Sequence, residues 1–276
     1  MLSKRLQTVA GMVTKGNIIA DIGTDHGYVP IYLVEENITD KAYAMDINQG
    51  PLDIANKHIK EKGLERKIIT ILSNGMEKLK DNMIDTAVIA GMGGDLIVSI
   101  LENGKSIKGI KELVLSPHKR VDLVRKYLLE NNWQIVDEAM VFDVGKYYTV
   151  IKALKCDKTE NDYSKVQLEY GKLLLENRNP VLKEYLEKEY KKFSKIAENM
   201  KKEKSDNLHK VEEILEMNQE GRKYYDWCGN FKCCIRIWRR NHFVRNSKGF
   251  WWLLWKWHYT CSVQWKTLWI VKSFNW

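Results

Sequence analysis

The sequence predicts an α/β fold built on an open, mostly parallel sheet. Between residues 18 and 131, short apolar runs typical of buried strands alternate with segments whose apolar residues recur at helical spacing. The first run, Ile18–Ile22, passes through a glycine-bearing turn directly into a helical segment. The last two runs follow one another through a short turn with no helix between them, which predicts an antiparallel final strand.

Each predicted element follows from its local pattern. A short helix opens the chain at Leu2–Val13, where Ser3 can cap the first turn. The seven predicted strands are Ile18–Ile22, Lys41–Asp46, Lys67–Leu72, Thr86–Ala90, Glu112–Ser116, Trp133–Phe142 and Tyr147–Leu154. The helices between them are predicted at about Val29–Glu36, Leu52–Lys62, Met76–Leu79, Asp95–Asn103 and Val121–Asn131. This alternation predicts a seven-stranded sheet with helices on both faces.

From Tyr163 onward the pattern changes to longer amphipathic helices. After a break at Asn179-Pro180, apolar residues recur at mixed three- and four-residue steps, and the polar face is rich in lysine and glutamate. This predicts a C-terminal α-helical hairpin with coiled-coil character. The chain is therefore divided into a sheet domain at residues 1–157, a helical arm at 158–218 and an atypical tail at 219–276.

The tail differs sharply in composition from the rest of the chain. The whole net charge of +9 comes from residues 220–276, which also hold nine of the ten Trp and four of the five Cys. Interleaved aromatic and basic residues also occur in single-strand nucleic-acid platforms, but no groove-forming fold accompanies them here. Tryptophan has the single codon TGG, which arises when glycine codons are read out of frame. We therefore predict that a frameshift produced the tail.

Composition and length exclude several classes of protein. A hydrophobic content of 44% over 276 residues suffices for one sizeable core with an appendage. The N-terminal residues lack the apolar segment of a signal peptide, and no run of about 18 uncharged apolar residues is present to span a membrane. Cys156 is the single cysteine before residue 220, which fits a reducing compartment. We therefore expect a cytoplasmic monomer with no membrane contact and no metal site.

The loop after the first strand is the most informative motif. Residues 21–27 read Asp-Ile-Gly-Thr-Asp-His-Gly and lead into a helix N-terminus with free N–H groups. A nicotinamide-binding fingerprint needs a glycine at position 25, where the carboxylate of Asp25 repels a pyrophosphate. The same carboxylate accepts hydrogen bonds from ammonium or hydroxyl groups. S-adenosylmethionine carries both and no phosphate, so the loop favours this methyl donor over NAD, with a turn that binds nothing as the alternative.

Polar residues and glycines follow the next strands at the edge of the sheet where ligands bind. Asp46, about 20 residues after the loop, is placed to accept both ribose hydroxyls, although such an acid also caps helices. Asn74 follows the third strand and either reaches the adenine edge or forms a turn. Gly91–Gly94 follows the fourth strand and leaves backbone close to a ligand, as a plain flexible loop also does. His118 follows the fifth strand, where a solvated loop histidine is expected more than a substrate contact.

Together these motifs resemble the bacterial TrmK family, which methylates N1 of adenine 22 in tRNA. The shared features are Leu-Ser-Lys-Arg-Leu at residues 2–6, the loop at residues 21–28, Gly50-Pro51, and Ala-Gly-Met-Gly-Gly at residues 90–94. The resemblance covers about residues 1–218. It implies a class I, Rossmann-like methyltransferase fold, S-adenosyl-L-methionine as the cofactor and tRNA as the partner. Asn74 departs from the family in replacing an expected acid, and residues 116–118 replace a more amide-like turn.

The resemblance gives each candidate residue an expected role. Adenine N1 has a free lone pair, so holding it about 3 Å from the sulfonium methyl supplies most of the acceleration. Asp25, His26 and Tyr28 are the expected catalytic residues, with Asp25 or His26 taking the proton that methylation acidifies, or with His26 only supporting the loop. The expected cofactor-binding residues are Asp21, Gly23, Asp25, His26, Asp46, Ile47, Asn74, Gly75 and Gly91. The expected substrate-binding residues are Gly91, Met92, Gly93, Gly94, Arg5, Lys119 and Arg120.

An RNA substrate adds two requirements. N1 lies on the pairing edge of adenine, so the base must be flipped out or already unpaired. Phosphate contacts need cations, and further candidates are Lys4, Arg125, Lys126, Lys191, Lys192, Lys195, Lys201 and Lys202. Two alternatives stay open: a methyltransferase acting on a small molecule or a protein, which has less need of a long arm, and a non-catalytic RNA-binding adapter.

Overall fold

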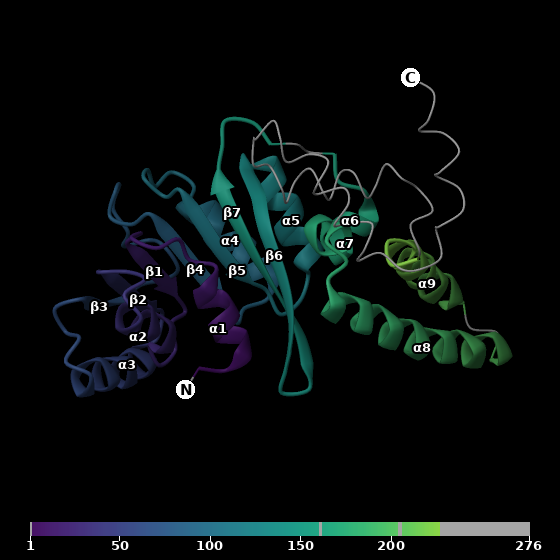
Figure 1. Ribbon diagram of the computed structural model, residues 1–276, viewed down its shortest axis with the longest axis horizontal. Helices are drawn as coiled ribbons and strands as arrows, with labels where there is room; N and C mark the ends of the chain where they lie inside the picture. The colour runs from purple at the N-terminus through teal and green to yellow at the C-terminus, as the bar shows by residue number, and fades with distance from the viewer. Residues whose placement is uncertain (1, 160–161, 204–205, 227–276) are drawn as a thin grey trace, which may run out of the picture. The chain divides into compact units, whose positions relative to one another are not determined.

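The computed structural model describes residues 2–159, 162–203 and 206–226, and its central feature is a seven-stranded sheet (Figure 1). The strand order is β3-β2-β1-β4-β5-β7-β6. The strands are β1 Ile19–Ile22, β2 Ala42–Asp46, β3 Ile68–Leu72, β4 Thr86–Ala90, β5 Glu112–Ser116, β6 Trp133–Asp143 and β7 Lys146–Lys155. Strands β1 to β5 pair in parallel, whereas β7 is antiparallel to both of its neighbours. The predicted strands and the antiparallel final strand are therefore confirmed.

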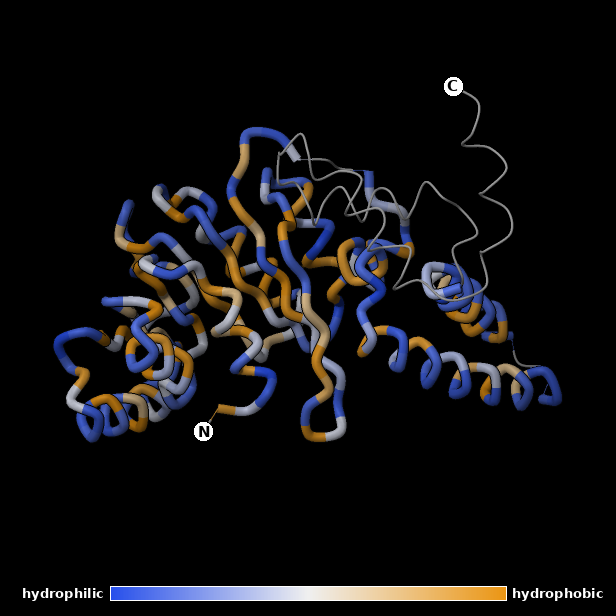
Figure 2. The backbone as a smooth tube through the Cα atoms, in the orientation of Figure 1, coloured by the Kyte–Doolittle hydropathy of each residue, from blue (hydrophilic) through white to orange (hydrophobic). Residues whose placement is uncertain are grey.

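Helices cover both faces of the sheet, because successive strand residues point to opposite sides. The helices of the domain are α1 Lys4–Gly11, α2 Tyr28–Glu35, α3 Gln49–Glu61, α4 Gly94–Gly104 and α5 Val121–Glu130. One apolar cluster joins the sheet to α1, α2 and α3 through Val9, Leu33 and Ile59. A second cluster joins the other face to α4 and α5 through Ile97 and Leu128. Figure 2 shows the apolar residues concentrated along the strands, as these two clusters require.

The helix predicted at Met76–Leu79 is wrong, since this segment forms a turn. Its backbone bonds span three residues, from Glu77 N to the Asn74 carbonyl (3.3 Å) and from Leu79 N to the Met76 carbonyl (2.9 Å). Four residues are too few to offset the cost of helix nucleation. Met76 and Leu79 are nevertheless buried in the core, so their apolar spacing reflects burial of a turn rather than a helix.

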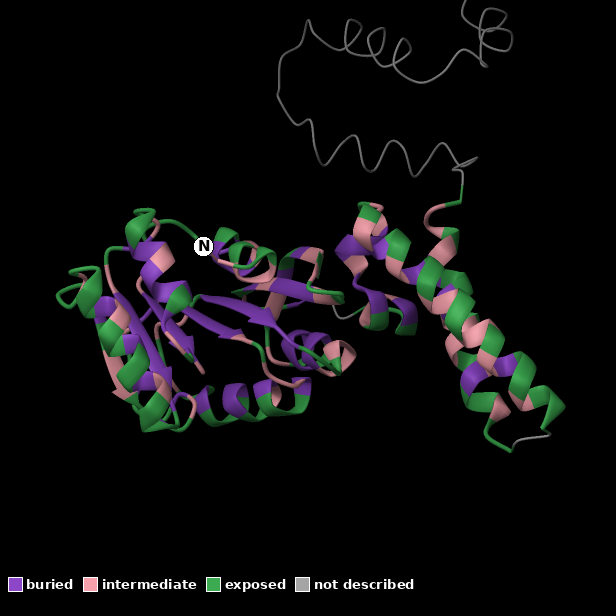
Figure 3. Ribbon diagram, turned by 90° about the horizontal axis from the view of Figure 1, so that it is seen from below, coloured by how far each residue is buried: buried purple, intermediate pink, exposed green. Residues whose placement is uncertain are grey.

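Four further helices follow the sheet: α6 Lys165–Tyr170, α7 Lys172–Glu176, α8 Pro180–Lys202 and α9 Leu208–Lys223. The break predicted at Asn179-Pro180 is confirmed, because the Asn179 side chain accepts hydrogen bonds from the first backbone N–H groups of α8. Asn218 of α9 donates to the carbonyl of Leu186 in α8 (3.0 Å), which ties the two helices together. Along α8, exposed and intermediate residues alternate with the buried Leu182, Leu186 and Ala197 (Figure 3). Its coiled-coil character stays a prediction, and α9 continues beyond residue 218.

A buried ion pair connects the sheet domain to these helices. Arg125 of α5 donates to Glu138 of β6 (2.7 Å), and both side chains are at most 1% exposed. The Arg125 guanidinium also donates to the carbonyls of Leu168 and Glu169 at 2.7 Å, and Glu138 accepts from Leu173 N–H. The phosphate contact predicted for Arg125 is therefore wrong, because its charge faces the protein interior.

No helix in the described ranges has the length and apolar character needed to cross a membrane. The same ranges contain no group of three or more His, Cys, Asp or Glu side chains arranged to hold a metal ion. The frameshift prediction concerns residues 219–276, of which 227–276 lie outside the described residues.

Candidate functional site

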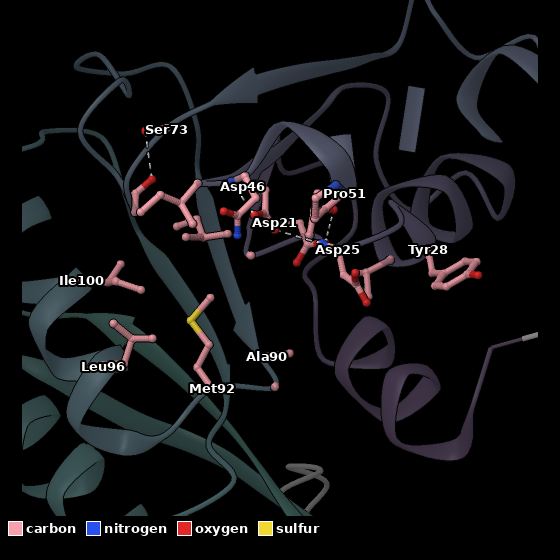
Figure 4. Close-up of a pocket in the computed structure, with 18 of the residues that line it drawn as sticks. Asp21, Asp25, Tyr28, Asp46, Pro51, Ser73, Ala90, Met92, Leu96 and Ile100 are labelled. Atoms are coloured by element: carbon pink, nitrogen blue, oxygen red, sulfur yellow. Dashed lines mark hydrogen bonds between the residues drawn. The ribbon is translucent and has the colours of Figure 1, made fainter. Parts of the chain in front are cut away.

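A cavity of about 610 Å³ lies beyond the carboxyl ends of β1, β2, β3 and β4. The strand order reverses between β1 and β4, which is where ligands bind in open α/β sheets. Figure 4 shows Asp21 and Asp46 near one another, with Met92, Leu96 and Ile100 across from them. The cavity brings together most of the predicted cofactor residues, which are Asp21, Gly23, Asp25, Asp46, Ile47, Asn74, Gly75 and Gly91.

The loop after β1 is held against β2 by its own backbone. The N–H groups of Gly23 and Thr24 both donate to the Met45 carbonyl (2.8 and 2.9 Å), and the Thr24 hydroxyl donates to Asp21 (2.7 Å). Asp25 has a φ of +54°, the left-handed conformation that glycine adopts most readily and aspartate tolerates. Asp25 therefore keeps the backbone shape of a glycine loop while it adds an exposed carboxylate beside the cavity.

Two carboxyl groups define the electrostatics of the cavity. Asp21 is buried, and this burial, opposed by the Thr24 hydrogen bond and reinforced by the charge of Asp46, raises the pKa of Asp21 to about 6. Asp46 is held at the end of β2, where it accepts from Asn48 N–H (2.9 Å). Such a pair favours a ligand that supplies a positive charge and hydroxyl donors over one that supplies phosphate.

The opposite wall of the cavity is apolar. Leu96 and Ile100 line it, and Ile47 lines the cavity next to Asp46; Ile47 and Leu96 are 61% and 53% exposed. Large exposed apolar side chains around a cavity are typical of a ligand site, here for a flat ring. Asn74 stands at the rim, where its side-chain nitrogen donates to Glu77 (2.7 Å). Sequence reasoning missed Leu96 and Ile100, because helical spacing alone does not separate a cavity wall from the core.

The loop after β4 has two parts: one lines the cavity, and the other contacts the loop after β5. Gly91 and Met92 line the cavity, and the methionine side chain covers Gly23, where an added Cβ would lie 2.1 Å from its terminal carbon. Gly93 and Gly94 are not among the lining residues. The N–H of Gly94 donates to the Lys119 carbonyl (2.8 Å), so this glycine joins two loops.

An aromatic and cationic cluster forms the edge of the cavity beside Gly91. The Arg5 guanidinium lies 5.3 Å from the Tyr148 ring centroid, and the His118 ring lies 5.4 Å from it. Arg5 Nη1 is buried and has no hydrogen-bond partner among the described residues. Partial burial, then the charges of Arg5 and Lys146, lower the pKa of His118. The structure thus places His118 in the lining of the cavity, and it adds Tyr148 as a neighbour of Arg5 and His118 that does not line the cavity itself.

The remaining predicted residues lie around the cavity or outside it. Tyr28 lines the cavity, and its ring stacks on His58 at 5.5 Å. The His26 ring is not part of the lining; it packs edge-on against Tyr28, and its Nε2 lies 3.5 Å from Asp25 Oδ1. This geometry favours the supporting role for His26. Lys119 and Arg120 line a second cavity instead.

Comparison with known proteins identifies the family. A family model described as a methyltransferase domain matches residues 2–151. The tRNA (adenine(22)-N(1))-methyltransferase of Bacillus subtilis (strain 168) is 37% identical over 174 residues, which are 63% of this chain and 73% of that protein. The crystal structure of the B. subtilis M1A22 tRNA methyltransferase TrmK matches with a TM-score of 0.72 and 31% identity, over 80% of this chain and 98% of that chain. This chain belongs to the TrmK family.

A second TrmK structure concerns the ligand. M. capricolum TrmK, solved in complex with S-adenosyl-homocysteine, matches with a TM-score of 0.70 and 36% identity, over 82% of this chain and 98% of that chain. The class I, Rossmann-like methyltransferase fold predicted from the sequence is therefore confirmed. Each TrmK structure is matched along nearly its whole length, while about a fifth of this chain is left unmatched.

Proposed function

We propose that this protein transfers the methyl group of S-adenosyl-L-methionine to N1 of adenine 22 in tRNA. The observation that carries the proposal is the cavity at the β1–β4 edge, with Asp21 and Asp46 on one side and an apolar wall on the other, in a member of the TrmK family. The cofactor supplies an electrophilic methyl group on a sulfonium. Its ammonium group and ribose hydroxyls match the two carboxylates, and its adenine matches the apolar wall.

Each side of the cavity has a separate role in this proposal. Asp21 holds the ammonium group, Asp46 accepts the ribose hydroxyls, and Ile47 and Leu96 enclose the adenine ring of the donor. The neighbourhood of Gly91 and Met92 receives the target base, which must be unpaired to expose N1. Because N1 is already nucleophilic, positioning rather than a strong base supplies most of the acceleration.

The methyl transfer itself balances without a proton, because the positive charge of the sulfonium passes to the adenine, and a proton leaves the adenine in a later step. Methylation at N1 places a positive charge on the adenine and acidifies its exocyclic amine. Asp25, exposed beside the cavity, accepts that proton, and His26 orients the Asp25 carboxylate from 3.5 Å away. Phosphate contacts come from Arg5, Lys119 and Arg120 and from lysines of the arm. With tRNA as its substrate, the protein acts in the cytoplasm, and we expect it to act as a monomer.

Methyl transfer to tRNA tests the proposal directly. The purified protein is incubated with unmodified bulk tRNA and S-adenosyl-L-methionine labelled on the methyl group, and the modified position is mapped by reverse-transcription stops. Label at N1 of adenine 22 is expected. Binding of the donor by calorimetry without transfer to tRNA would point to another acceptor, and no donor binding at all would point to a non-catalytic adapter.

A further inference from the structure

A second cavity, of about 380 Å³, adjoins the site through a shared residue. His118 lines both cavities, and the loop that carries it continues into the floor of the second one through Lys119 and Arg120. The remaining walls come from the β6–β7 hairpin, with Tyr147, and from the helices after the sheet, with Glu169. The second cavity therefore lies where the sheet domain meets the arm.

Backbone hydrogen bonds fix the position of the second cavity relative to the first. His118 N–H donates to the Met92 carbonyl, and Gly94 N–H donates to the Lys119 carbonyl, both at 2.8 Å. These bonds join the floor of the second cavity to the glycine loop that borders the first. A group held in the second cavity is consequently kept at a set distance from the first cavity.

Most hydroxyl groups of the second cavity already have partners. Tyr147 donates to Glu184 (2.8 Å), and Tyr170 and Tyr185 both donate to Glu189 (2.7 and 2.8 Å). Tyr170 is buried, so only the partly exposed rings of Tyr147 and Tyr185 offer surfaces for stacking, while all three hydroxyls are bonded to the protein. A polar ligand in this cavity would therefore be bound by the charged side chains rather than by the tyrosine hydroxyls.

Besides His118, four charged side chains line the cavity, namely Lys119, Arg120, Asp122 and Glu169, and Asp122 is paired with Arg120. The side chains of Glu169 and Lys119 take part in none of the hydrogen bonds or ion pairs that the structure shows within residues 2–159, 162–203 and 206–226, although their backbone carbonyls accept from Arg125 and Gly94. Arg120 makes only long contacts, 3.5 Å to Asp122 and 3.8 Å to Asp95. A carboxylate that lines the same cavity as two cations and partly exposed aromatic rings suits a molecule with N–H donors, a flat ring and a phosphate.

We propose that the second cavity holds another nucleotide of the same tRNA, close in sequence to the target adenine, whose base presents adjacent N–H donors to Glu169 as guanine does. This inference rests on the proposed function and names a second recognition point for its substrate. The N1–H and N2–H groups of guanine match the two oxygens of a carboxylate, and such charge-assisted pairs are among the stronger hydrogen bonds. Unpaired RNA bases are commonly read on this edge while they stack on aromatic side chains. Lys119 and Arg120 then neutralise the adjoining phosphates.

A pair of charge-matched variants tests the role of Glu169. Glu169→Gln keeps the size of the side chain but replaces one carboxylate oxygen, an acceptor, with an amide NH2. This donor would face the N–H groups of the base. Glu187→Gln removes the same charge from an exposed position of α8 that does not line either cavity. We expect Glu169→Gln to lower kcat/KM for a tRNA transcript about ten- to hundredfold, mainly through KM, and to leave donor binding unchanged. Glu187→Gln should match the wild type.

Altered transcripts identify the nucleotide and separate recognition from folding. Each guanine near the target is replaced in turn by inosine, which lacks the N2 amino group. One replacement should weaken the wild type and have little further effect on Glu169→Gln, because both changes remove the same contact. A merely structural role of Glu169 would give additive effects with every transcript.

Binding measurements distinguish the possible failures. Fluorescence anisotropy with labelled transcript measures affinity without methyl transfer, so it reports on Glu169 even if tRNA is not methylated. Absence of methyl transfer by the wild type would reject the proposed function alone. Equal kinetics and equal transcript affinity for Glu169→Gln and Glu187→Gln would reject the second-nucleotide cavity. Binding of free GMP to the wild type with no effect of any inosine replacement would also reject it, since the ligand would then be a free nucleotide.

Discussion

At the scale of single residues, Asp21 links the folding of the β1 loop to ligand binding. Burial raises its pKa to about 6, above its ordinary value of 3.8, so its ionisation is unfavourable in the empty protein. The folded protein therefore binds more protons at this group than the unfolded chain does between these pH values. Its contribution to stability falls as pH rises from about 4 to about 6, and binding of a cationic ligand has the opposite dependence.

The ionisation of Asp21 predicts how the affinity for the methyl donor depends on pH. The affinity for S-adenosyl-L-methionine should rise between pH 5 and pH 7, by up to about tenfold per pH unit below the pKa, because the ammonium group requires the ionised carboxylate. Calorimetry at pH 5, 6 and 7 measures this. Asp21→Asn should bind weakly with little pH dependence, and it should be more stable than the wild type at pH 7 without ligand. An Asp21→Asn variant that keeps the wild-type pH dependence would exclude Asp21 as its source.

Asp25 and His26 differ in their expected contributions to catalysis. If Asp25 accepts the proton and His26 only orients it, Asp25→Ala should reduce kcat about 10²-fold or more, whereas His26→Ala should reduce it less. Single-turnover methyl transfer to tRNA measures both, and donor affinity serves as the control for folding of the loop. Rates near wild type in both variants would remove these residues from the mechanism.

At the scale of elements, the glycine loop after β4 serves packing as much as ligand binding. An added Cβ at Gly94 would lie 2.3 Å from the Arg120 carbonyl oxygen and 2.8 Å from that of Lys119, and backbone cannot move aside as a flexible side chain can. At Gly93 an added Cβ would have no neighbour within 4 Å among the described residues. Two adjacent glycines therefore make a matched pair for experiment.

We predict that Gly94→Ala destabilises the protein by about 1–3 kcal/mol, because the loop that carries His118 must shift. Gly93→Ala should unfold at the same denaturant concentration as the wild type. Chemical denaturation of both variants, monitored by circular dichroism, gives the comparison. Equal destabilisation by the two substitutions would contradict the proposed packing role of Gly94.

The sequence was sufficient to predict the sheet and the carboxylate side of the site. Strands and motif residues are local signals: an apolar run ending in Asp21 or Asp46 marks a strand end wherever the chain goes next. The second cavity is not local, since Tyr147, Glu169 and Tyr185 meet only when the arm packs on the hairpin. Arg125 was misread for the same reason, because its partner Glu138 lies on the following strand.

At the scale of the whole molecule, the tail differs from the rest of the chain in composition. We interpret this difference as the result of a frameshift. Six solved structures, among them the two TrmK structures named above, match over 97–99% of their own length to about four-fifths of this chain. We predict that resequencing the gene will show a frame change near the codons for residues 219–226. An uninterrupted frame shared with close relatives would overturn the frameshift hypothesis.

The buried pair of Arg125 and Glu138 determines how the arm joins the sheet domain. It ties α5, β6 and the start of α7 together, and an added Cβ at Gly171 would lie 2.8 Å from both partners, so the glycine leaves room for the pair. Desolvating two charges offsets much of their attraction, but removing one of them leaves the other buried without a partner.

We therefore predict that Arg125→Met destabilises the protein by about 3–5 kcal/mol. Lys126→Met, next in sequence and exposed, should have no measurable effect. Arg125→Met combined with Glu138→Leu should recover much of the loss, because no charge is then left unpaired. Urea unfolding measures stability, and limited proteolysis between β7 and α8 reports whether the arm has separated. Loss of stability without faster cleavage there would show that the pair supports the core alone. Faster cleavage together with weaker tRNA binding would show that the pair also holds the walls of the second cavity together.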